Sequence, residues 1–451
     1  MKKILLSLLA LANCTFSFAK QVGEETAKTV GYNFLKSQAH SSVPADASGL
    51  QLVYTVKSAD KSNICMYIFN TATNGFVVVS GDDIANPVLG YSDEGMFDPG
   101  NIPPDLAYLT NGLSNDISYG IEHSIAASST IQGKWSMLKS TAPVAAKATA
   151  STVVAPLVLT KWNQSPYYNY TCPFDNTQNT YTLTGCVATA MAQVMRYWSY
   201  PATGTGSHSY NHPQYGQQSA NFGATTYRWD VMSYTIGSLS AGAIDTIMYH
   251  AGVSVNMDYG VDESGSYVIS SASPITNCAE YSLKTYFKYK SSLQGLARNQ
   301  YSTQQWLAML KMELNASRPI IYSGFGNQGG HCWIADGYDA NDFLHLNWGW
   351  GGASNGYFAL NAMDPASMGP GNGFDNNHQA IIGIMPAQPQ IKMDLNDHVN
   401  VPTTIAYNNP FSITTKIINN GTNNFGGDYI ARVFNANGQL IDSIQLIAGN
   451  T

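Results

Sequence analysis

Cys186 is the residue of this chain whose position is hardest to explain by packing alone. It follows Gly185 in the stretch TGCVATAMAQVM (184–195), and apolar side chains then recur with helical spacing from Val187 to Trp198. The spacing predicts an amphipathic helix whose first turn holds Cys186. A lone helical cysteine is more often a small core residue. Free backbone N–H groups and the positive end of the helix dipole stabilise a thiolate in a first turn, so we expect a reactive thiol.

A thiolate nucleophile needs a base that can later give its proton to the leaving amine. The candidate is His331, which follows two glycines in IIYSGFGNQGGHCWIADGYD (320–339). The segment that begins at His331 is predicted to be a strand, so the side chains of His331 and Cys332 point to opposite faces. We expect His331 to face a cleft and Cys332 to face the packed interior. The other histidines are expected to be structural.

Three further side chains could support this pair. An amide carbonyl of Asn347 can hold the second imidazole nitrogen, and the indoles of Trp348 and Trp350 can shield that bond from water. An aromatic hairpin in the core is the alternative interpretation of NWGWGG (347–352), and the two roles can coexist. A glutamine upstream of the cysteine can add its side-chain NH2 to the backbone N–H of the nucleophile as an oxyanion donor. Gln164 is the candidate, although a glutamine in a polar loop means little alone.

The composition limits the kinds of partner that the chain can have. Of its 451 residues 44% are hydrophobic and 11% are charged, and the net charge is −7. Such a length predicts about two to four domains. No basic run or stripe is present, so nucleic acid is not an expected partner.

The first residues predict export. A basic start and an apolar run over residues 4–12 precede the small-x-small sequence SFA (17–19), which predicts a signal peptide over residues 1–19. A lipoprotein signal cut before Cys14 is the alternative, but Asn13 is larger than the usual residue at that position. The apolar run is too short to span a bilayer, and no later stretch is long enough, so no transmembrane segment is expected.

Residues 20–125 carry a pattern of their own. Apolar spacing predicts one helix through 27–35 and another through 106–121, and alternating runs between them predict strands, two of which form a hairpin around 73–75. Residues 126–156 are rich in Ala, Ser and Thr and poor in core-forming side chains, which is typical of an exposed linker. We therefore expect a small domain on a tether that a protease can cut.

Residues 157–386 form the largest predicted unit, and a β-rich tail follows it. In the tail, Asn437-Gly438 between YIARVF and QLIDSIQLI predicts a hairpin. The tail has too few strands to close two sheets, so we expect an incomplete β-sandwich-like extension. The predicted boundaries are 1–19 for the signal peptide, 20–147 for the first domain and linker, 148–386 for the main domain, and 387–451 for the extension.

The cysteines give two further expectations. Removal of a signal peptide would take Cys14 and leave five cysteines, and an odd number in an exported protein implies at least one free thiol. Whether Cys172 and Cys278 are paired stays open. The cysteine and histidine spacings match no zinc pattern, so we expect neither a metal nor another cofactor.

Several long motifs, in one order, resemble the streptopain family of secreted bacterial cysteine proteases, whose catalytic core is papain-like. The matching stretches are WNQSPYYN (162–169), TGCVATAMAQVMRYW (184–198), VSVNMDYG (253–260), GGHCWIADGYD (329–339) and NWGWGGASNGYFALNAMDP (347–365). FVVVSGDDIANPVLGYSDEGMFD (76–98) also resembles the inhibitory pro-domain of that family, so the resemblance extends over 20–386.

The resemblance implies an α+β fold, with a papain-like two-subdomain core after an α+β pro-domain. It implies a zymogen that hydrolyses proteins or peptides, with the pro-domain as intramolecular inhibitor, secreted or held at the surface or in the periplasm of a bacterium. It implies site residues as follows: Cys186 as nucleophile, His331 as general base and acid, Gln164 as oxyanion donor, and Asn347, Trp348 and Trp350 around the histidine.

Two features depart from the family pattern. Cys332 stands where the family usually has a small apolar residue, which places a second thiol beside the site. The stretch 261–277 differs in length and composition, so its lining of the substrate cleft is open.

Two alternatives stay open. A papain-like acyltransferase or amidase uses the same Cys-His chemistry and differs only in the acceptor of the acyl group. A catalytically idle surface-binding protein would use the tail for adhesion, although the thiol, imidazole, amide and oxyanion donor are all present.

Overall fold

The structure of the chain is a computed structural model. It describes residues 20–38, 43–140, 152–237, 240–270, 275–326, 329–363 and 377–388, and four strands beyond them. The predicted signal peptide, 1–19, lies outside the described residues. The chain divides into two compact units, Met1–Met385 and Pro386–Thr451. Within the first unit we call residues 20–140 the N-terminal lobe and 152–385 the central lobe; the domain boundaries given above stay predictions.

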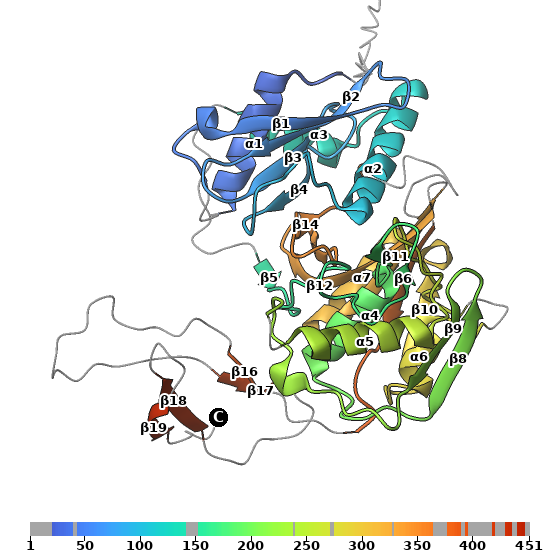
Figure 1. Cartoon of the computed structure of the whole chain (residues 1–451). Helices are drawn as coiled ribbons and strands as arrows, with labels where there is room; N and C mark the ends of the chain where they lie inside the picture. The colour runs from blue at the N-terminus through green and yellow to red at the C-terminus, as the bar shows by residue number, and fades with distance from the viewer. Residues whose placement is uncertain are drawn as a thin grey trace, which may run out of the picture. The chain divides into compact units, whose positions relative to one another are not determined.

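The N-terminal lobe is an antiparallel sheet with helices on both faces (Figure 1). Alternation along β3 explains the two faces, since Val77 and Val79 pack with α1 and α3 while Phe76 and Val78 pack with α2. The predicted helices and the β2–β3 hairpin are confirmed. The elements are α1 (Glu24–Ser37), the short 3-10 helix η1 (Ala47–Gly49), β1 (Gln51–Lys57), β2 (Ile64–Asn70), β3 (Phe76–Ser80), β4 (Val88–Ser92), α2 (Pro104–Glu122) and α3 (Ser129–Lys139).

The prediction of an exposed linker over 126–156 is wrong for its first half. Residues Ser129–Lys139 form α3, which begins at the cap Ser128 and buries Ile131, Trp135 and Leu138 against α1. Their i, i+4, i+7 spacing is a short apolar stripe. The surrounding small residues made the average composition look like a linker. Residues 141–151 lie outside the described residues.

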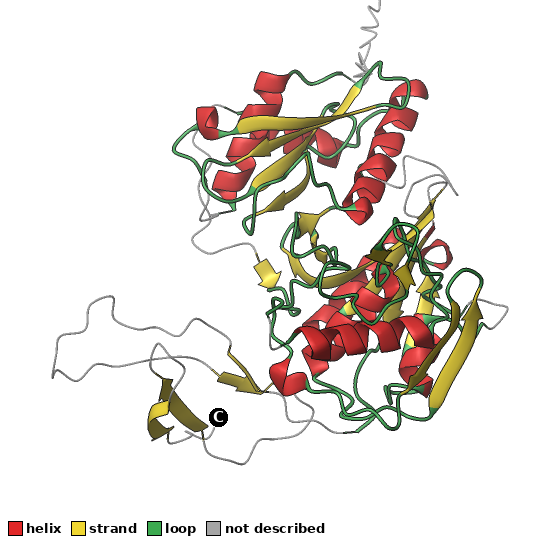
Figure 2. Ribbon diagram, viewed as in Figure 1, coloured by secondary structure: helices red, strands yellow, loops and turns green. Residues whose placement is uncertain are grey.

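The central lobe joins a sheet to a set of helices (Figure 2). Along the sheet the strand order is β14-β13-β12-β11-β15-β10, with β5 beside β12, and all these pairs are antiparallel. The sheet strands are β5 (Thr152–Val154), β10 (Gln294–Ala297), β11 (Ile320–Gly326), β12 (Gly329–Asp339), β13 (Leu344–Asn347), β14 (Gly356–Phe358) and β15 (His378–Ile382). Two hairpins, β6 (Phe174–Asp175) with β7 (Thr180–Tyr181) and β8 (Ser207–His212) with β9 (Gly216–Asn221), stand apart. The helices are α4 (Cys186–Trp198), η2 (Trp229–Val231), α5 (Ala241–Ser254), α6 (Ala279–Thr285), η3 (Arg298–Gln300) and α7 (Thr303–Asn315).

The two faces of this sheet meet different helices. Cys332 and Ile334 of β12 belong to the apolar cluster around α4, whereas Trp333 and Ala335 belong to the cluster that contains α7 and the α2 helix of the N-terminal lobe. Strand alternation therefore places odd-numbered residues of this part of β12, His331 among them, on the α2 face.

The sheets of the two lobes are continuous, because β4 pairs with β14. Tyr357 lies opposite Tyr91 and Phe358 opposite Gly90, where a Cβ would be 2.4 Å from the Phe358 ring. The Tyr91 hydroxyl also donates to Asp339 of the central lobe at 2.9 Å. The strands of the N-terminal lobe thus extend the sheet of the central lobe, and the two lobes share one apolar cluster.

Helix α4 is confirmed, but it is more buried than an amphipathic surface helix. The predicted stripe from Val187 to Trp198 is buried, and so are Thr189 and Gln193 on other faces. The α+β class is confirmed. In the second unit the described strands form two antiparallel pairs, β16 (Met393–Leu395) with β17 (Ile417–Asn419) and β18 (Tyr429–Phe434) with β19 (Leu440–Leu446). The second pair confirms the predicted hairpin, whose turn, 437–438, lies outside the described residues.

Among the described residues, no helix combines the length and the apolar character needed to cross a membrane.

Candidate active site

Cys186 is the first residue of α4, and the glycine before it allows the chain to enter the helix. Gly185 has a φ of 89°, and a Cβ there would lie 2.5 Å from the Met257 sulfur and 3.0 Å from the Ser264 carbonyl oxygen. Only glycine fits such a turn without strain. The backbone N–H groups of Val187 and of Cys186 itself interact with the Cys186 sulfur. The thiol therefore lies in the first-turn position that the sequence predicts.

His331 lies on β12, directly opposite Gly324 of β11. Its side chain is 20% exposed, and its ring centroid is 5.2 Å from that of Tyr108, which comes from α2 of the N-terminal lobe. Since Gly324 has no side chain, the Tyr108 hydroxyl fits beside it, only 2.7 Å from where a Cβ would be. Burial lowers the pKa of His331 because it disfavours the imidazolium. A helix of the N-terminal lobe thus covers the predicted base.

Asp105, in the first turn of α2, reaches the same place. Its Oδ2 accepts a hydrogen bond of 2.7 Å from the Trp350 indole, and its Oδ1 lies 3.8 Å from Nδ1 of His331. The carboxyl is buried, and burial raises its pKa to about 7 despite the indole and the backbone N–H of Cys332. One carboxyl of the N-terminal lobe therefore interacts with two segments of the predicted site, the Trp350 loop and the start of β12.

The same carboxyl affects the thiol. Burial first, and the nearby Asp105 second, raise the pKa of Cys186 to about 12, against the opposing effect of the N–H groups of Cys332, Val187 and Cys186. Within the part of the chain that the structure describes, no hydrogen bond joins the Cys186 sulfur to the His331 ring. Burial and the nearby carboxyl therefore both favour the protonated thiol in this structure.

Gln164 is placed close to the nucleophile. Its carbonyl accepts the N–H of Thr184 at 3.3 Å, and its own N–H donates to the Asn163 side chain at 2.7 Å. Thr184 is two residues before Cys186, so the Gln164 loop and the start of α4 are joined directly. The Gln164 side chain is 3% exposed. The structure therefore places the Gln164 backbone beside the turn that precedes Cys186, and its role as oxyanion donor stays a prediction.

The three residues predicted to surround the histidine, Asn347, Trp348 and Trp350, make different contacts in the structure. Asn347 is not in contact with His331: its amide donates to the Thr160 carbonyl at 2.9 Å, and its oxygen accepts from Gly349 N–H at 3.1 Å. Trp348 is fully buried and donates to the carbonyl of a neighbouring loop, which is a core role. Trp350 is linked to His331 through Asp105, which accepts a hydrogen bond from the Trp350 indole and lies 3.8 Å from Nδ1 of His331. Their roles around an active histidine stay predictions.

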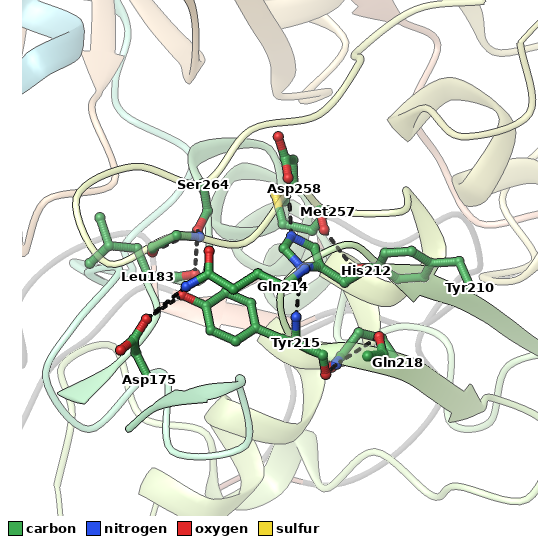
Figure 3. Close-up of polar contacts among 12 residues, drawn as sticks. Asp175, Leu183, Tyr210, His212, Gln214, Tyr215, Gln218, Met257, Asp258 and Ser264 are labelled. Carbon is green, nitrogen blue, oxygen red and sulfur yellow. Dashed lines mark hydrogen bonds and ion pairs between the residues drawn. The ribbon is translucent and has the colours of Figure 1, made fainter. Parts of the chain in front are cut away.

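Polar contacts brace the loop that leads to the nucleophile (Figure 3). Leu183 donates its N–H to the Gly260 carbonyl at 2.9 Å, and its carbonyl accepts from the Ser264 hydroxyl at 2.9 Å. The Tyr210 hydroxyl donates to the carbonyl of Met257, the residue that packs on Gly185. The beginning of the 261–277 stretch, which departs from the family pattern, therefore helps to fix the position of Cys186.

The far side of this network centres on His212, at the end of β8 (Figure 3). Its Nδ1 accepts the N–H groups of Gln214 and Tyr215, both at 3.2 Å, so Nε2 carries the proton and donates to Asp258 at 3.0 Å. Asp175 accepts from the Gln214 amide and the Tyr215 hydroxyl at 2.9 Å each. His212 is thus a structural histidine that ties the β8–β9 hairpin to its neighbours.

Sequence reasoning missed Asp105 and Tyr108. Tyr108 lies within the helix predicted over 106–121, and Asp105 comes just before it. An acidic residue in the first turn of a helix is common because it interacts favourably with the helix dipole, so nothing marked Asp105 as special. The signal that could have identified Asp105 is its position at the start of a helix in a segment that resembles an inhibitory domain, because a helix of such a domain is expected to contact the active site.

Two family models match the chain. The model of the Peptidase C10 family matches residues 162–358, a range that includes Cys186 and His331. The model described as Spi protease inhibitor matches residues 19–117, a range that includes Asp105 and Tyr108.

Individual proteins agree with these matches. Streptopain of Streptococcus pyogenes is 33% identical over 416 residues, which cover 85% of this chain and 98% of that protein. The thiol protease/hemagglutinin PrtT of Porphyromonas gingivalis is 31% identical over 81% of this chain, which spans 41% of its length. Among solved structures, a fragment of Prevotella intermedia prointerpain A matches with a TM-score of 0.58 and 28% identity, over 74% of this chain and 98% of that one.

Proposed function

The chain belongs to the peptidase C10 family and is a cysteine peptidase, and we propose that it is an exported endopeptidase zymogen in which Cys186 and His331 form the catalytic pair. The observation that supports this best is the covering of His331 by Tyr108 and Asp105. These two residues lie in the segment that matches a protease inhibitor. A base covered in this way belongs to an enzyme held inactive.

The proposed mechanism begins with the Cys186 thiolate, which attacks the carbonyl carbon of the scissile peptide bond. The backbone N–H of Cys186 and the side-chain amide of Gln164 stabilise the oxyanion. The His331 imidazolium then gives its proton to the leaving amine, and a thioester acyl-enzyme remains. Water, deprotonated by His331, hydrolyses the thioester and restores the pair.

Latency follows from the position of α2. Burial, and after it the charge of Asp105, raise the pKa of the Cys186 thiol, while burial next to Tyr108 lowers the pKa of the His331 imidazole. Removal of the N-terminal lobe takes both groups away, so His331 is free to turn toward Cys186 and to form the thiolate-imidazolium pair. The N-terminal lobe is therefore the intramolecular inhibitor of the proposed enzyme.

Self-processing is the proposed route to the active form. The central lobe begins with β5, which is paired with β12, and the N–H of Val158 donates to Asp336 at 2.8 Å. A cut before β5 would leave these contacts intact. We propose a mature chain that begins within 148–157, with a start at or before Thr152 favoured because it keeps β5 paired with β12, released after export directed by the predicted signal peptide.

The nearest alternative is acyl transfer to an acceptor other than water, which needs the same pair. The test is the cleavage of casein by the purified, activated chain, with and without an alkylating agent that blocks thiols. Endopeptidase activity predicts new N-termini that alkylation abolishes. Release of ammonia, or cross-linking without new N-termini, would instead show an amidase or acyltransferase.

A further inference from the structure

Cys332 is a second thiol next to the nucleophile, and the proposed mechanism does not use it. It follows His331 on β12, where regular pairing with Ser323 keeps the strand alternation intact. Its side chain is 2% exposed and lies in the apolar cluster around α4, the cluster against which Cys186 also packs. The Cys332 side chain therefore lies on the α4 side of the sheet, against which Cys186 packs, while the His331 side chain lies on the α2 side.

The two residues are in direct contact. The backbone N–H of Cys332 interacts with the Cys186 sulfur, at the end of β12 that β13 does not reach, since the β12–β13 pairing begins at Ile334. Burial first, and then the charges of Cys186 and Asp105, raise the pKa of the Cys332 thiol well above its ordinary value. The backbone contact and the shared apolar cluster place the two thiols near each other.

All five cysteines among the described residues are free. Besides Cys186 and Cys332, these are Cys65, Cys172 and Cys278, which are buried elsewhere. A buried thiol is poorly nucleophilic toward solvent, but it can attack the oxidised sulfur of a neighbouring residue.

We propose that Cys332 is a resolving thiol for Cys186, so that oxidation of the nucleophile by a peroxide ends in a reversible Cys186–Cys332 disulfide. The proposal rests on the proposed role of Cys186 as a nucleophile. In the first step the Cys186 thiolate attacks hydrogen peroxide: an S–O bond forms, the O–O bond breaks, and the released hydroxide takes a proton to give water. In the second step the Cys332 sulfur attacks Cys186–SOH: the S–S bond forms, the S–O bond breaks, and the Cys332 proton leaves with the hydroxide as water.

The consequence is protection. Without a resolving thiol, a sulfenic acid at Cys186 is open to further oxidation to the sulfinic acid, which simple thiols do not reverse. With Cys332 in contact, the disulfide stores the nucleophile in a form that a thiol reductant restores. The N-terminal lobe supplies a second layer of protection, because Asp105 and burial keep Cys186 protonated and unreactive until activation.

The test is peroxide treatment of the activated enzyme, followed by peptide mapping by mass spectrometry and by measurement of the activity recovered with dithiothreitol. The wild type should yield a Cys186–Cys332 cross-linked peptide, lighter by two hydrogens, and regain nearly all activity. Cys332→Ala should yield a Cys186 peptide heavier by two oxygens and regain about tenfold less activity. Cys278→Ala, which removes another buried free thiol at the start of α6, is the matched control and should behave as the wild type.

Cys332→Ser serves as a second variant in case the alanine side chain leaves a damaging cavity. A wild type that gains two oxygens at Cys186 without any cross-link would overturn the proposal, as would equal recovery of the wild type and both Cys332 variants. The cross-link is measured as a mass, so it decides the proposal even for a chain that cleaves no casein. Inactivity of the untreated enzyme would count against the proposed function instead.

Discussion

The two halves of the proposed catalytic pair are held by different parts of the molecule. Cys186 is fixed by the central lobe alone, through a buried helix, a glycine turn and the brace around Leu183. His331 is held from outside, by Tyr108 and Asp105 of the N-terminal lobe. The comparison indicates that the proposed nucleophile is positioned by the fold of the central lobe, whereas the proposed base is contacted by the N-terminal lobe. Activation therefore needs to change the surroundings of the histidine more than the position of the cysteine.

Removal of either partner of the pair should have the largest effect. Cys186→Ala and His331→Ala should each lower kcat/KM on casein by about 10³-fold or more, because thiolate and imidazole act as one unit. The double variant should then be no slower than either single variant. Steady-state kinetics on enzyme activated in trans check this. Additive losses would mean that one of the two residues only supports the structure.

The Gln164→Ala variant tests the proposed oxyanion donor beside Cys186. Gln164→Ala should lower kcat by about 10²–10³-fold with little change in KM, because the bond is strongest in the transition state. Gln178→Ala, at an exposed turn of the β6–β7 hairpin, is the matched control. An unchanged kcat in Gln164→Ala would remove this residue from the site.

The Asp105→Asn variant tests the contact of the N-terminal lobe with His331 through the pH dependence of the stability of the full chain. The pKa of Asp105 is raised from 3.8 to about 7 in the covered site. An acid with a raised pKa stabilises the covered state while it is protonated. This stability is lost as pH rises from 3.8, the ordinary pKa, toward about 7, the pKa in the covered site. The loss amounts to at most roughly 4 kcal/mol. In a Cys186→Ala background, the melting temperature of the full chain should fall over this range.

The asparagine variant keeps an acceptor for the Trp350 indole but has no titrating carboxyl, so its melting temperature should lack this fall. The lowered pKa of His331 acts in the opposite direction, since protonation below 6.5 weakens the covered state. That effect is present in both chains and cancels in their difference. Parallel curves for aspartate and asparagine would show that the carboxyl does not titrate in the covered site.

Gly185→Ala should have the smallest effect of the set. A φ of 89° with a ψ of 142° costs an alanine about 1–3 kcal/mol, and its Cβ would push on the Met257 sulfur. We expect about tenfold lower activity in the mature enzyme with a modest loss of stability. Gly133→Ala, in the open middle of α3, is the matched control and should be neutral. Met257→Ala in the same chain should relieve part of the defect.

The elements that carry the site could be predicted, because their signals are local. The apolar spacing after Cys186 gives α4, and alternation around His331 gives β12. The junction of the lobes could not be predicted, since β4 and β14 pair across more than 260 positions and no local pattern specifies that partner. The contact of Asp105 with Trp350 and His331 depends on that junction, and so was missed with it.

Other differences arose where average composition hid a pattern or where one residue had several partners. The apolar stripe of α3 is only three residues, within a segment of small side chains. Asn347 has the residue type and spacing to orient a histidine, yet the amide is occupied by Thr160 and Gly349. Spacing predicts that such a side chain is near the site but does not predict which neighbour it bonds.

The most direct test of the account is the titration of His331 in the covered and uncovered states. NMR of isotope-labelled histidines can follow its ring in Cys186→Ala, before and after removal of the N-terminal lobe by a trace of active enzyme, with His331→Gln to assign the signal. The account predicts a His331 pKa below its ordinary 6.5 in the full chain and a rise toward that value after removal. An identical titration in both states would contradict it, because the N-terminal lobe would then not control the base.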